Sequence, residues 1–325
     1  MIELKNQTVI ASNAETGLLD MGDGIACLEF RSKGNSISPL VREFILETLT
    51  KRLGCFDGLI IANQGKMFSA GADLTSIRQR IEDHDFAELE KRVRSFQSMT
   101  SQIKRCPKPV VAAPFHMTLG GGLEITLHSH AKVALSKCYM GLVEIGVGLI
   151  PGGGGTKQSA IIAASSDEKE RNSALLTVFQ KLLCRTVSKS GDDARRLLYL
   201  TEDDVIVNDM EDLIPTAKQK CLELTKRNRV GGDARSVELP GKQGYDLLMD
   251  KAAELRERDV ISPYDLELAK ILARVLCGSS TDGPALYTEG QLLELEAQGF
   301  LEAAHHRGTY DRIVYFLENN KMLRN

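Results

Sequence analysis

Two glutamates lie in glycine-rich stretches of the sequence, Glu124 in "GGGLEITL" and Glu144 in "VEIGVGLIPGGGG". Two carboxyl groups that share a closed apolar site rarely ionise together, so one holds a proton while the other accepts one. Either glutamate alone would more often be a solvated helix residue. The glycines beside them let a reactant approach the main chain closely, so the question is what chemistry lies nearby.

The four consecutive glycines at 152–155 have three interpretations: a flexible linker, a phosphate-binding loop, or a turn that approaches a reactant closely. A linker would have polar, Ser-rich flanks, but "EIGVGLIP" is apolar and a helix-like segment follows from Thr156. The dinucleotide pattern Gly-x-Gly-x-x-Gly fails at Pro151, and the Gly-Lys-Ser/Thr of a P-loop is absent. Close approach of the backbone is therefore the favoured interpretation, since successive N–H groups near a helix N-terminus can point at one target.

The composition limits the class of protein. The chain has 325 residues, 42% of them hydrophobic, which suffices for a sizeable core in one or two domains. Its 41 basic and 44 acidic residues offer no support for a nucleic-acid or anionic-membrane partner. No window holds 18 apolar residues, so no membrane-spanning helix is expected. Seven cysteines without a CxxC pair, and an N-terminus without a signal-peptide pattern, predict a cytoplasmic protein with reduced thiols.

Strand-like and helix-like segments alternate up to about residue 160, which predicts an α/β fold. The predicted buried strands cover 24–30, 58–64, 108–114 and 131–137. The predicted helices cover 39–53, 86–106 and 120–130, and another begins at Thr156. From residue 165 the sequence becomes charged and helix-patterned. We therefore expect a core with the active site at 1–190 and a helical C-terminal region at 191–325.

Three stretches resemble the motifs of the crotonase (enoyl-CoA hydratase/isomerase) superfamily in their order, spacing and residue types: "GKMFSAGADL" (65–74), "HMTLGGGLEITLHSH" (116–130) and "GLVEIGVGLIPGGGG" (141–155). The resemblance covers at least residues 20–165 and resumes near the C-terminus. The interval of about 190–285 is longer than in a minimal member. In this respect the chain looks most like the hydratase portion of some bacterial fused 3-hydroxyacyl-CoA dehydrogenases.

The resemblance implies a crotonase (ClpP-like) superhelix of ββα units, followed by a helical C-terminal region that includes the longer-than-usual insertion. It also implies assembly as a homo-oligomer, a trimer or hexamer. The expected activity is the addition of water to 2-trans-enoyl-CoA in fatty-acid β-oxidation, which gives 3-hydroxyacyl-CoA. We expect no metal, and no cofactor other than the coenzyme A of the substrate thioester. A separate 3-hydroxyacyl-CoA dehydrogenase is a candidate partner.

The resemblance also implies roles for five residues. Hydration places negative charge on the thioester oxygen, which two preorganised N–H donors can stabilise. Carried over by motif, these donors are the main-chain N–H groups of Ala72 and Gly121. Glu124 corresponds to the base that activates water, and Glu144 to the acid that protonates C2. Gly152 corresponds to the position whose N–H helps to hold the attacking water.

Two alternatives stay open. Double-bond isomerases of this family commonly keep only the equivalent of Glu144, since they move a proton without adding water, so Δ3-Δ2 enoyl-CoA isomerisation is one alternative. The other is a non-catalytic CoA-binding subunit that works with a dehydrogenase. The presence of both Glu124 and Glu144 favours the hydratase over both alternatives.

By the same resemblance, the segment "RSKGNSIS" (31–38) and the second motif contact coenzyme A, although this segment departs from the family's usual K-x-x-N-A-L wording. The candidate contacts are Lys33, Asn35, Ser69, Ala70, Asp73 and Leu74. We expect Asp73 to act structurally rather than as an acid or base. His128 and His130 have the wrong spacing for two metal ligands on one helix face, which is consistent with a metal-free site.

Overall fold

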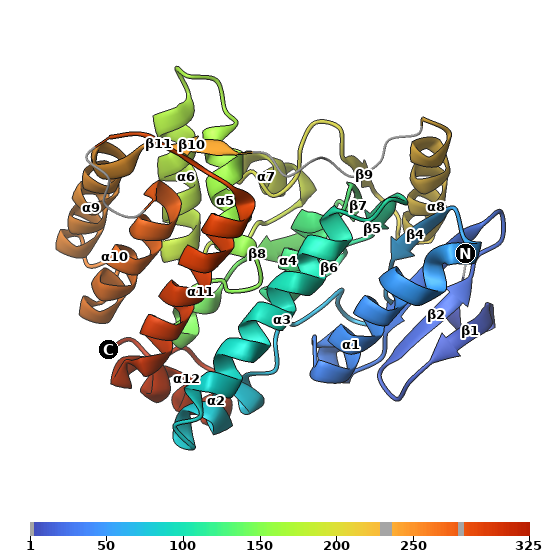
Figure 1. Ribbon diagram of the computed structural model, residues 1–325, viewed down its shortest axis with the longest axis horizontal. Coiled ribbons are helices and arrows are strands. Elements are labelled where there is room, and N and C mark those ends of the chain that lie inside the picture. The colour runs from blue at the N-terminus through green and yellow to red at the C-terminus, as the bar shows by residue number, and fades with distance from the viewer. Residues whose placement is uncertain (1–2, 228–235, 279–282) are drawn as a thin grey trace. The chain divides into compact units, whose positions relative to one another are not determined.

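The computed structural model describes residues 3–227, 236–278 and 283–325 (Figure 1). Contacts group the chain into two compact units. The first unit comprises Met1–Asp73, Ser98–Gly141 and Ser188–Asp233, and the second comprises Leu74–Gln97, Leu142–Val187 and Ala234–Asn325. Each unit is therefore assembled from segments that are far apart in the sequence. The division between a core at 1–190 and a helical region at 191–325 stays a prediction.

A seven-stranded sheet forms the centre of the first unit. Its strands, in spatial order, are β1 (Thr8–Ser12), β2 (Thr16–Asp20), β3 (Ile25–Phe30), β4 (Gly58–Ile61), β5 (Val110–Ala112), β7 (Ala131–Leu135) and β9 (Val205–Val207). The pairs β1–β2 and β2–β3 are antiparallel, and every pair from β3 to β9 is parallel. Strands β3, β4 and β5 are buried along their whole length, and the sequences of β4 and β5 are continuously apolar, as burial on both faces requires.

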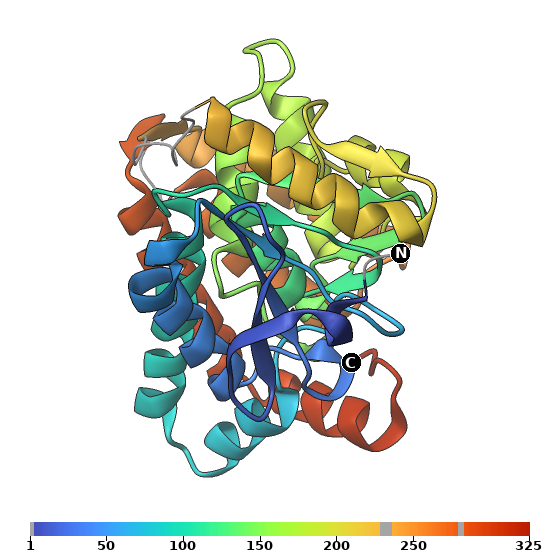
Figure 2. The same cartoon turned by 90° about the vertical axis from the view of Figure 1, so that its right-hand side faces the viewer.

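The helices of the first unit cover this sheet and carry the glycine-rich motif. They are α1 (Pro39–Glu47), α4 (Gly121–His128), α7 (Gly191–Arg196), α8 (Met210–Lys226) and the C-terminal part of α3 (Phe86–Lys104). Helix α8 packs on the sheet against β4, β5 and β7 (Figure 2). Two short parallel strands, β6 (His116–Leu119) and β8 (Cys138–Gly141), form a separate ladder beside α4. The four predicted strands and three predicted helices are thus present, and the α/β prediction is confirmed.

Helices dominate the second unit. They are α2 (Leu74–Glu82), the N-terminal part of α3, α5 (Gly155–Ala164), α6 (Arg171–Leu183), α9 (Gly241–Glu257), α10 (Pro263–Cys277), α11 (Glu289–His305) and α12 (Arg307–Asn319). Strands β10 (Val237–Leu239) and β11 (Ala285–Tyr287) pair in antiparallel orientation. Helix α10 packs against α5, α6, α9 and α11, so most of its residues are buried. Within the described ranges, no helix combines the length and the apolar character needed to cross a bilayer.

Sequence signals at the helix ends explain where these helices begin. The Ser38 hydroxyl accepts the Val41 N–H at the start of α1, and Pro39 occupies the first turn. Helix α10 begins with a reciprocal capping box between Ser262 and Asp265. These caps satisfy N–H groups that have no acceptor inside the helix, so each helix starts at a defined residue.

Candidate functional site

Two segments of the first unit, 34–37 and 70–72, lie side by side. The Ala70 N–H donates to the Gly34 carbonyl at 2.9 Å, and the Ile37 N–H donates to the Gly71 carbonyl at 2.9 Å. Ile37 and Ala72 also form an isolated parallel bridge. The structure therefore places the predicted coenzyme A segment directly against the "FSAGAD" motif.

Ser69 joins a third segment to these two. Its N–H donates to the Met117 carbonyl at 3.1 Å, and the Leu119 N–H donates back to the Ser69 carbonyl at 3.0 Å. Its hydroxyl donates to the Asn35 carbonyl at 2.7 Å and accepts the Gly71 N–H at 3.1 Å. Ser69 is fully buried, so this side chain holds the loops in place.

Gly71 lies where the second segment meets the start of α4. Its φ of +97° is a conformation that favours glycine. A Cβ atom at this position would lie 3.0 Å from the Leu119 carbonyl oxygen and 3.4 Å from the Gly121 nitrogen. The main chain next to Ala72 therefore touches the main chain that leads into Gly121, as a pair of N–H donors aimed at one oxygen would require.

The N–H groups of Ala72 and Gly121 donate no hydrogen bond to the protein within the described residues. Gly121 is the first residue of α4, where N–H groups have no acceptor inside the helix and the helix dipole favours negative charge. Ala72 is exposed, whereas Gly121 is buried. This arrangement leaves two donors for a ligand oxygen, and their role as an oxyanion hole stays a prediction.

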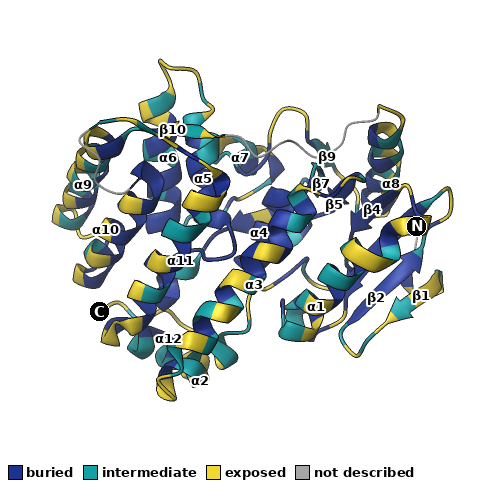
Figure 3. Cartoon of the chain, viewed as in Figure 1, coloured by how far each residue is buried: buried dark blue, intermediate teal, exposed yellow. Residues whose placement is uncertain are grey.

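Glu124 lies in the first turn of α4, a helix that is buried throughout (Figure 3). Only 3% of the residue is exposed. Its N–H donates to the Gly120 carbonyl at 2.9 Å, and its carbonyl accepts a hydrogen bond from His128 Nδ1 at 2.6 Å. The glutamate is thus a rigidly held, buried carboxyl group on the helix whose first residue is Gly121.

The tight packing of α4 against Ser69 gives a stability prediction. A Cβ atom at Gly122 would lie 2.4 Å from the Ser69 Cβ, and Ser69 is fixed by its hydrogen bonds. We expect Gly122→Ala to lower the free energy of unfolding by about 1–3 kcal/mol, as overpacking does. Denaturant unfolding measures this change. The control is Gly54→Ala, because nothing lies within 4 Å of a Cβ atom there; equal stability of both variants would contradict the prediction.

The six candidate coenzyme A contacts have different environments. Lys33 and Ala70 are exposed, whereas Asp73 and Leu74 are half-buried. The buried Asn35 donates its side-chain amide to the Met67 carbonyl at 2.9 Å. Asn35 and Ser69 therefore use polar side-chain atoms to shape the loop, and Lys33 is the charged member of the set that faces solvent.

The two histidines at the end of α4 make backbone contacts. His130 accepts the Val110 N–H through Nδ1 at 2.8 Å, so its Nε2 donates to the Lys104 carbonyl at 3.0 Å. Burial lowers the pKa of His130, which favours this neutral form. Within the described part of the chain, no group of three or more His, Cys, Asp or Glu residues is arranged to hold a metal ion. The absence of a metal stays a prediction.

Glu144 lies in the second unit, where it begins a 3-10 helix, η5 (Glu144–Val147). Its Oε2 atom is buried and has no hydrogen-bond partner among the described residues. Burial raises the pKa of this carboxyl group, and the nearby Glu296 carboxylate raises it further. A buried, unsatisfied carboxyl oxygen needs a functional explanation, and a group that carries a proton to a substrate provides one.

The glycine run points its N–H groups at a protein carboxyl group. The Gly154 N–H donates to Glu296 Oε1 at 2.6 Å, and the Lys157 N–H donates to Glu296 Oε2 at 2.8 Å. These donors lie at the N-terminus of α5, where an anion is favoured. At Gly152, a Cβ atom would lie 2.6 Å from the Phe300 ring. The expected close approach is thus seen within the protein, whereas the predicted contact of Gly152 with water stays a prediction.

A further helix of the second unit, α12, holds the turn that carries Glu144. Arg312 of α12 is fully buried, and its Nη1 donates to the Ile145 carbonyl at 2.8 Å and to Asp265 at 2.7 Å. The Thr309 hydroxyl donates to the Gly148 carbonyl. The sequence analysis did not identify Glu296 or Arg312. The signal for Glu296 is its spacing with Leu292 and Phe300, which places a glutamate on the apolar face of α11.

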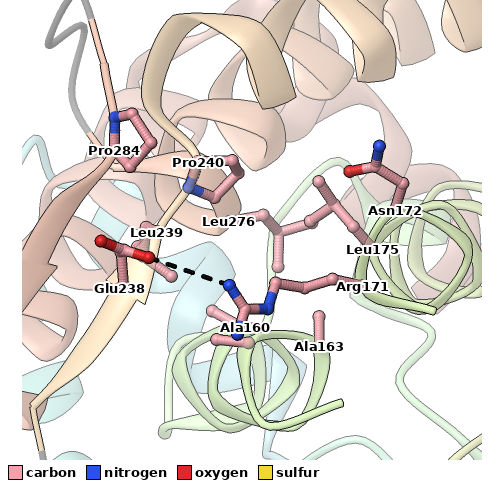
Figure 4. Close-up of a pocket in the computed structure, with 11 residues that line it drawn as sticks. Ala160, Ala163, Arg171, Asn172, Leu175, Glu238, Leu239, Pro240, Leu276 and Pro284 are labelled. Atoms are coloured by element: carbon pink, nitrogen blue, oxygen red, sulfur yellow. Dashed lines mark ion pairs between the residues drawn. The ribbon is translucent and has the colours of Figure 1, made fainter. Parts of the chain in front are cut away.

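A separate cavity of about 90 Å³ lies in the second unit among α5, α6, α10 and β10 (Figure 4). Apolar side chains such as Leu175 and Leu276 line it, and an ion pair joins Arg171 and Glu238 across 3.8 Å at its wall. None of the predicted site residues lines this cavity. The predicted site residues thus lie elsewhere than this cavity, and their chemistry stays a prediction.

Comparison with solved structures defines the class of protein. An enoyl-CoA hydratase from Bacillus halodurans superimposes with a TM-score of 0.62 at 15% identity, over 93% of this chain and 99% of that chain. The chain therefore has the crotonase fold, with a mainly parallel sheet and many helices, as predicted.

Sequence comparison then finds similarity to one family. Residues 28–160 match the family model described as enoyl-CoA hydratase/isomerase. A probable 3-hydroxyacyl-CoA dehydrogenase from Bacillus subtilis is 38% identical over 317 residues, which are 98% of this chain and 40% of that protein. A putative fatty acid oxidation complex trifunctional enzyme from Rickettsia prowazekii is 32% identical over 149 residues, which are 46% of this chain and 21% of that protein. The chain is thus similar to the enoyl-CoA hydratase/isomerase family over residues 28–160, and it spans less than half the length of either relative.

Proposed function

We propose that this chain is an enoyl-CoA hydratase, which converts 2-trans-enoyl-CoA to 3-hydroxyacyl-CoA. The observation that carries the proposal is the pair of N–H groups at Ala72 and Gly121 on touching main-chain segments, beside the buried Glu124 of the same helix. An oxyanion hole next to a carboxyl group is what addition of water to an α,β-unsaturated thioester needs.

The proposed reaction has two proton transfers. Glu124 removes a proton from water as the oxygen forms a bond to C3. The electron pair of the C2–C3 double bond shifts toward the thioester carbonyl, and its oxygen becomes the enolate that the Ala72 and Gly121 N–H groups stabilise. Glu144 then gives its proton to C2, so the thioester carbonyl re-forms. Glu124 ends protonated and Glu144 ionised, and one water has been added.

The raised pKa of Glu144 suits the role of proton donor. An ordinary glutamate is almost fully ionised at neutral pH. Burial, with the added effect of the Glu296 charge, raises the pKa of Glu144 to about 8. Its carboxyl group therefore holds the proton that C2 requires at neutral pH.

The hydration rate is accordingly expected to fall as the pH rises through about 8, the pKa of Glu144. The protonated form is the active one, so activity is retained below this pH and lost above it. The measurement is kcat/KM for crotonyl-CoA hydration across neutral and alkaline pH, because this ratio reports ionisations of the free enzyme. A rate that stays level well above this pH would rule out Glu144 as the acid.

A turnover assay tests the proposed function itself. Loss of the enoyl thioester absorbance is followed with short-chain and long-chain 2-enoyl-CoA, and the rate with a 3-enoyl-CoA is compared. We expect hydration to be the faster reaction, because Glu124 supplies the second carboxyl group that isomerisation does not need. Faster turnover of the 3-enoyl-CoA would favour the isomerase. Binding of coenzyme A without turnover of any of these thioesters would favour a non-catalytic subunit.

We place this activity in fatty-acid β-oxidation, with a 3-hydroxyacyl-CoA dehydrogenase as the enzyme that consumes the product. The dehydrogenase and trifunctional-enzyme names of the two relatives support this placement. We also propose that the chain forms a trimer or hexamer. Light scattering of the purified protein measures the assembly, and a pull-down with the dehydrogenase tests the partnership.

A further inference from the structure

Glu296 is a fully buried carboxyl group that the proposed reaction does not use. It lies on the apolar face of α11, and three donors surround it: the Gly154 N–H at 2.6 Å, the Lys157 N–H at 2.8 Å and Gln97 Nε2 at 3.1 Å. Removing an anion from water is costly, and replacing it with an apolar side chain often does not destabilise a protein. The retention of a glutamate here therefore needs a reason beyond packing.

The contacts of Glu296 hold one end of the segment that contains Glu144 and Gly152. Both oxygens of the carboxyl group are used: one accepts the N–H of the last glycine before α5, and the other accepts an N–H inside its first turn. The other end of the segment is held at Ile145 by Arg312 and at Gly148 by Thr309. Glu296 is thus the anchor of the C-terminal side of this turn.

Burial raises the pKa of the Glu296 carboxyl group, whereas the Lys157 and Gly154 N–H groups lower it, and its charge in turn raises the pKa of Glu144 in the same unit. The charged groups on the elements packed around the pair include the buried Lys181 of α6, Lys157 of α5, Arg312 of α12, Asp265 of α10 and Arg185, whose side chain lies beside Gly146. Arg312 and Arg185 are both paired with Asp265. Lys157 lies 3.3 Å from Glu289, its ion-pair partner. Lys157, Arg312 and Arg185 are thus each paired with an acid other than Glu296.

We propose that Glu296 is a positioning residue for the proposed hydration: its carboxyl group anchors the glycine turn that follows Glu144, and its charge acts on Glu144 in the same unit. This inference rests on the proposed function for its catalytic consequence, but the coupling of the two carboxyl groups is a property of the second unit alone. Glu296 touches neither substrate nor reacting atoms in this role. It acts through Glu144 and through the main chain of the turn.

The Glu296→Gln variant tests the charge. It keeps the side-chain volume and removes the like charge next to Glu144, so the pKa of Glu144 should fall by on the order of 1 unit or more. The alkaline limb of kcat/KM for crotonyl-CoA hydration should move to lower pH by the same amount. A purely structural role would lower the rate without moving the limb. A well-folded Glu296→Gln protein with an unmoved limb would overturn the inference.

The Glu296→Asp variant tests the anchor. It keeps the charge but withdraws the carboxyl group by one methylene from the Gly154 and Lys157 N–H groups. We expect kcat to fall severalfold while the alkaline limb stays in place. Wild-type kcat in this variant would overturn the positioning role, and this test remains decisive if the Gln variant does not fold. The matched control is Glu302→Gln at an exposed position of α11, which should change neither readout.

A titration that does not use turnover separates this inference from the proposed function. The infrared carboxyl band of Glu144, assigned by its loss in Glu144→Gln, is followed with pH in the wild type and in Glu296→Gln. We expect the Glu144 band to titrate at lower pH in the variant, whatever reaction the protein performs. If the wild type hydrates no enoyl thioester, the proposed function is contradicted, but the inference about Glu296 is not. If the Glu144 band titrates at the same pH in the wild type and in Glu296→Gln, the inference about the charge of Glu296 is contradicted, but the proposed function is not.

Discussion

The Glu144→Gln variant is expected to lose hydration of crotonyl-CoA by about 10²–10⁴-fold, the usual worth of a general acid. Glutamine has nearly the same volume as a protonated glutamate, so the buried turn around Ile145 should keep its structure. The amide cannot give a proton to C2. The loss should therefore appear in kcat, with little change in KM, because the proton moves only in the transition state.

Two comparisons make this prediction specific to the acid role. Glu302→Gln changes an exposed glutamate of the second unit and should hydrate at the wild-type rate. Glu124→Gln should be as defective as Glu144→Gln, and the double variant should be little worse than either, since residues that act as a unit are strongly non-additive. A Glu144→Gln protein with wild-type hydration would remove the proton-donor assignment and leave the oxyanion N–H groups unaffected.

The sequence predicted the buried strands well, and the reason is physical. Strands such as β4 and β5 are covered on both faces, so their continuous runs of Ile, Val and Ala are visible without knowledge of the partners. Strand β1 was harder to predict because its exposed and half-buried residues show no alternation. Its position depends on antiparallel pairing with β2, a tertiary fact that the local pattern does not encode.

The residues of the candidate site likewise include some that the sequence predicts and some that it does not. Features that depend only on neighbouring residues could be predicted from the sequence: Gly121 begins a helix, and Gly71 has a backbone conformation that glycine favours. The acceptor for the N–H groups of the glycine turn could not be predicted from the sequence. Glu296 lies far along the chain, and only the packing of α11 on α5 brings it to the Gly154 N–H. A glutamate on an apolar helix face was the available signal, but its partner could not be read from spacing.

The Arg312→Met variant is expected to lose about 3–5 kcal/mol of unfolding free energy, the cost of breaking a buried ion pair by removing one partner. Arg312 is fully buried, and its guanidinium donates to Asp265, to the Ser262 hydroxyl and to the Ile145 carbonyl. Methionine fills much of the volume but leaves these three acceptors without their donor. Denaturant unfolding of the full chain measures the loss, and hydration at low temperature should fall as well because the turn at Ile145 loses an anchor.

The matched control is Arg324→Met, which removes an exposed ion pair with Asp259 and should cost less than about 1 kcal/mol. The loss in Arg312→Met should also depend on pH. Burial alone would raise the pKa of Asp265, but the Ser262 N–H and the Arg312 guanidinium together lower it. A lowered pKa stabilises the folded protein above the unfolded-state pKa, and that stability disappears as the pH falls through the folded value. The gap between wild type and Arg312→Met should therefore narrow in acid, whereas a gap that is equal at neutral and acidic pH would show that Arg312 stabilises by packing and not by its charge.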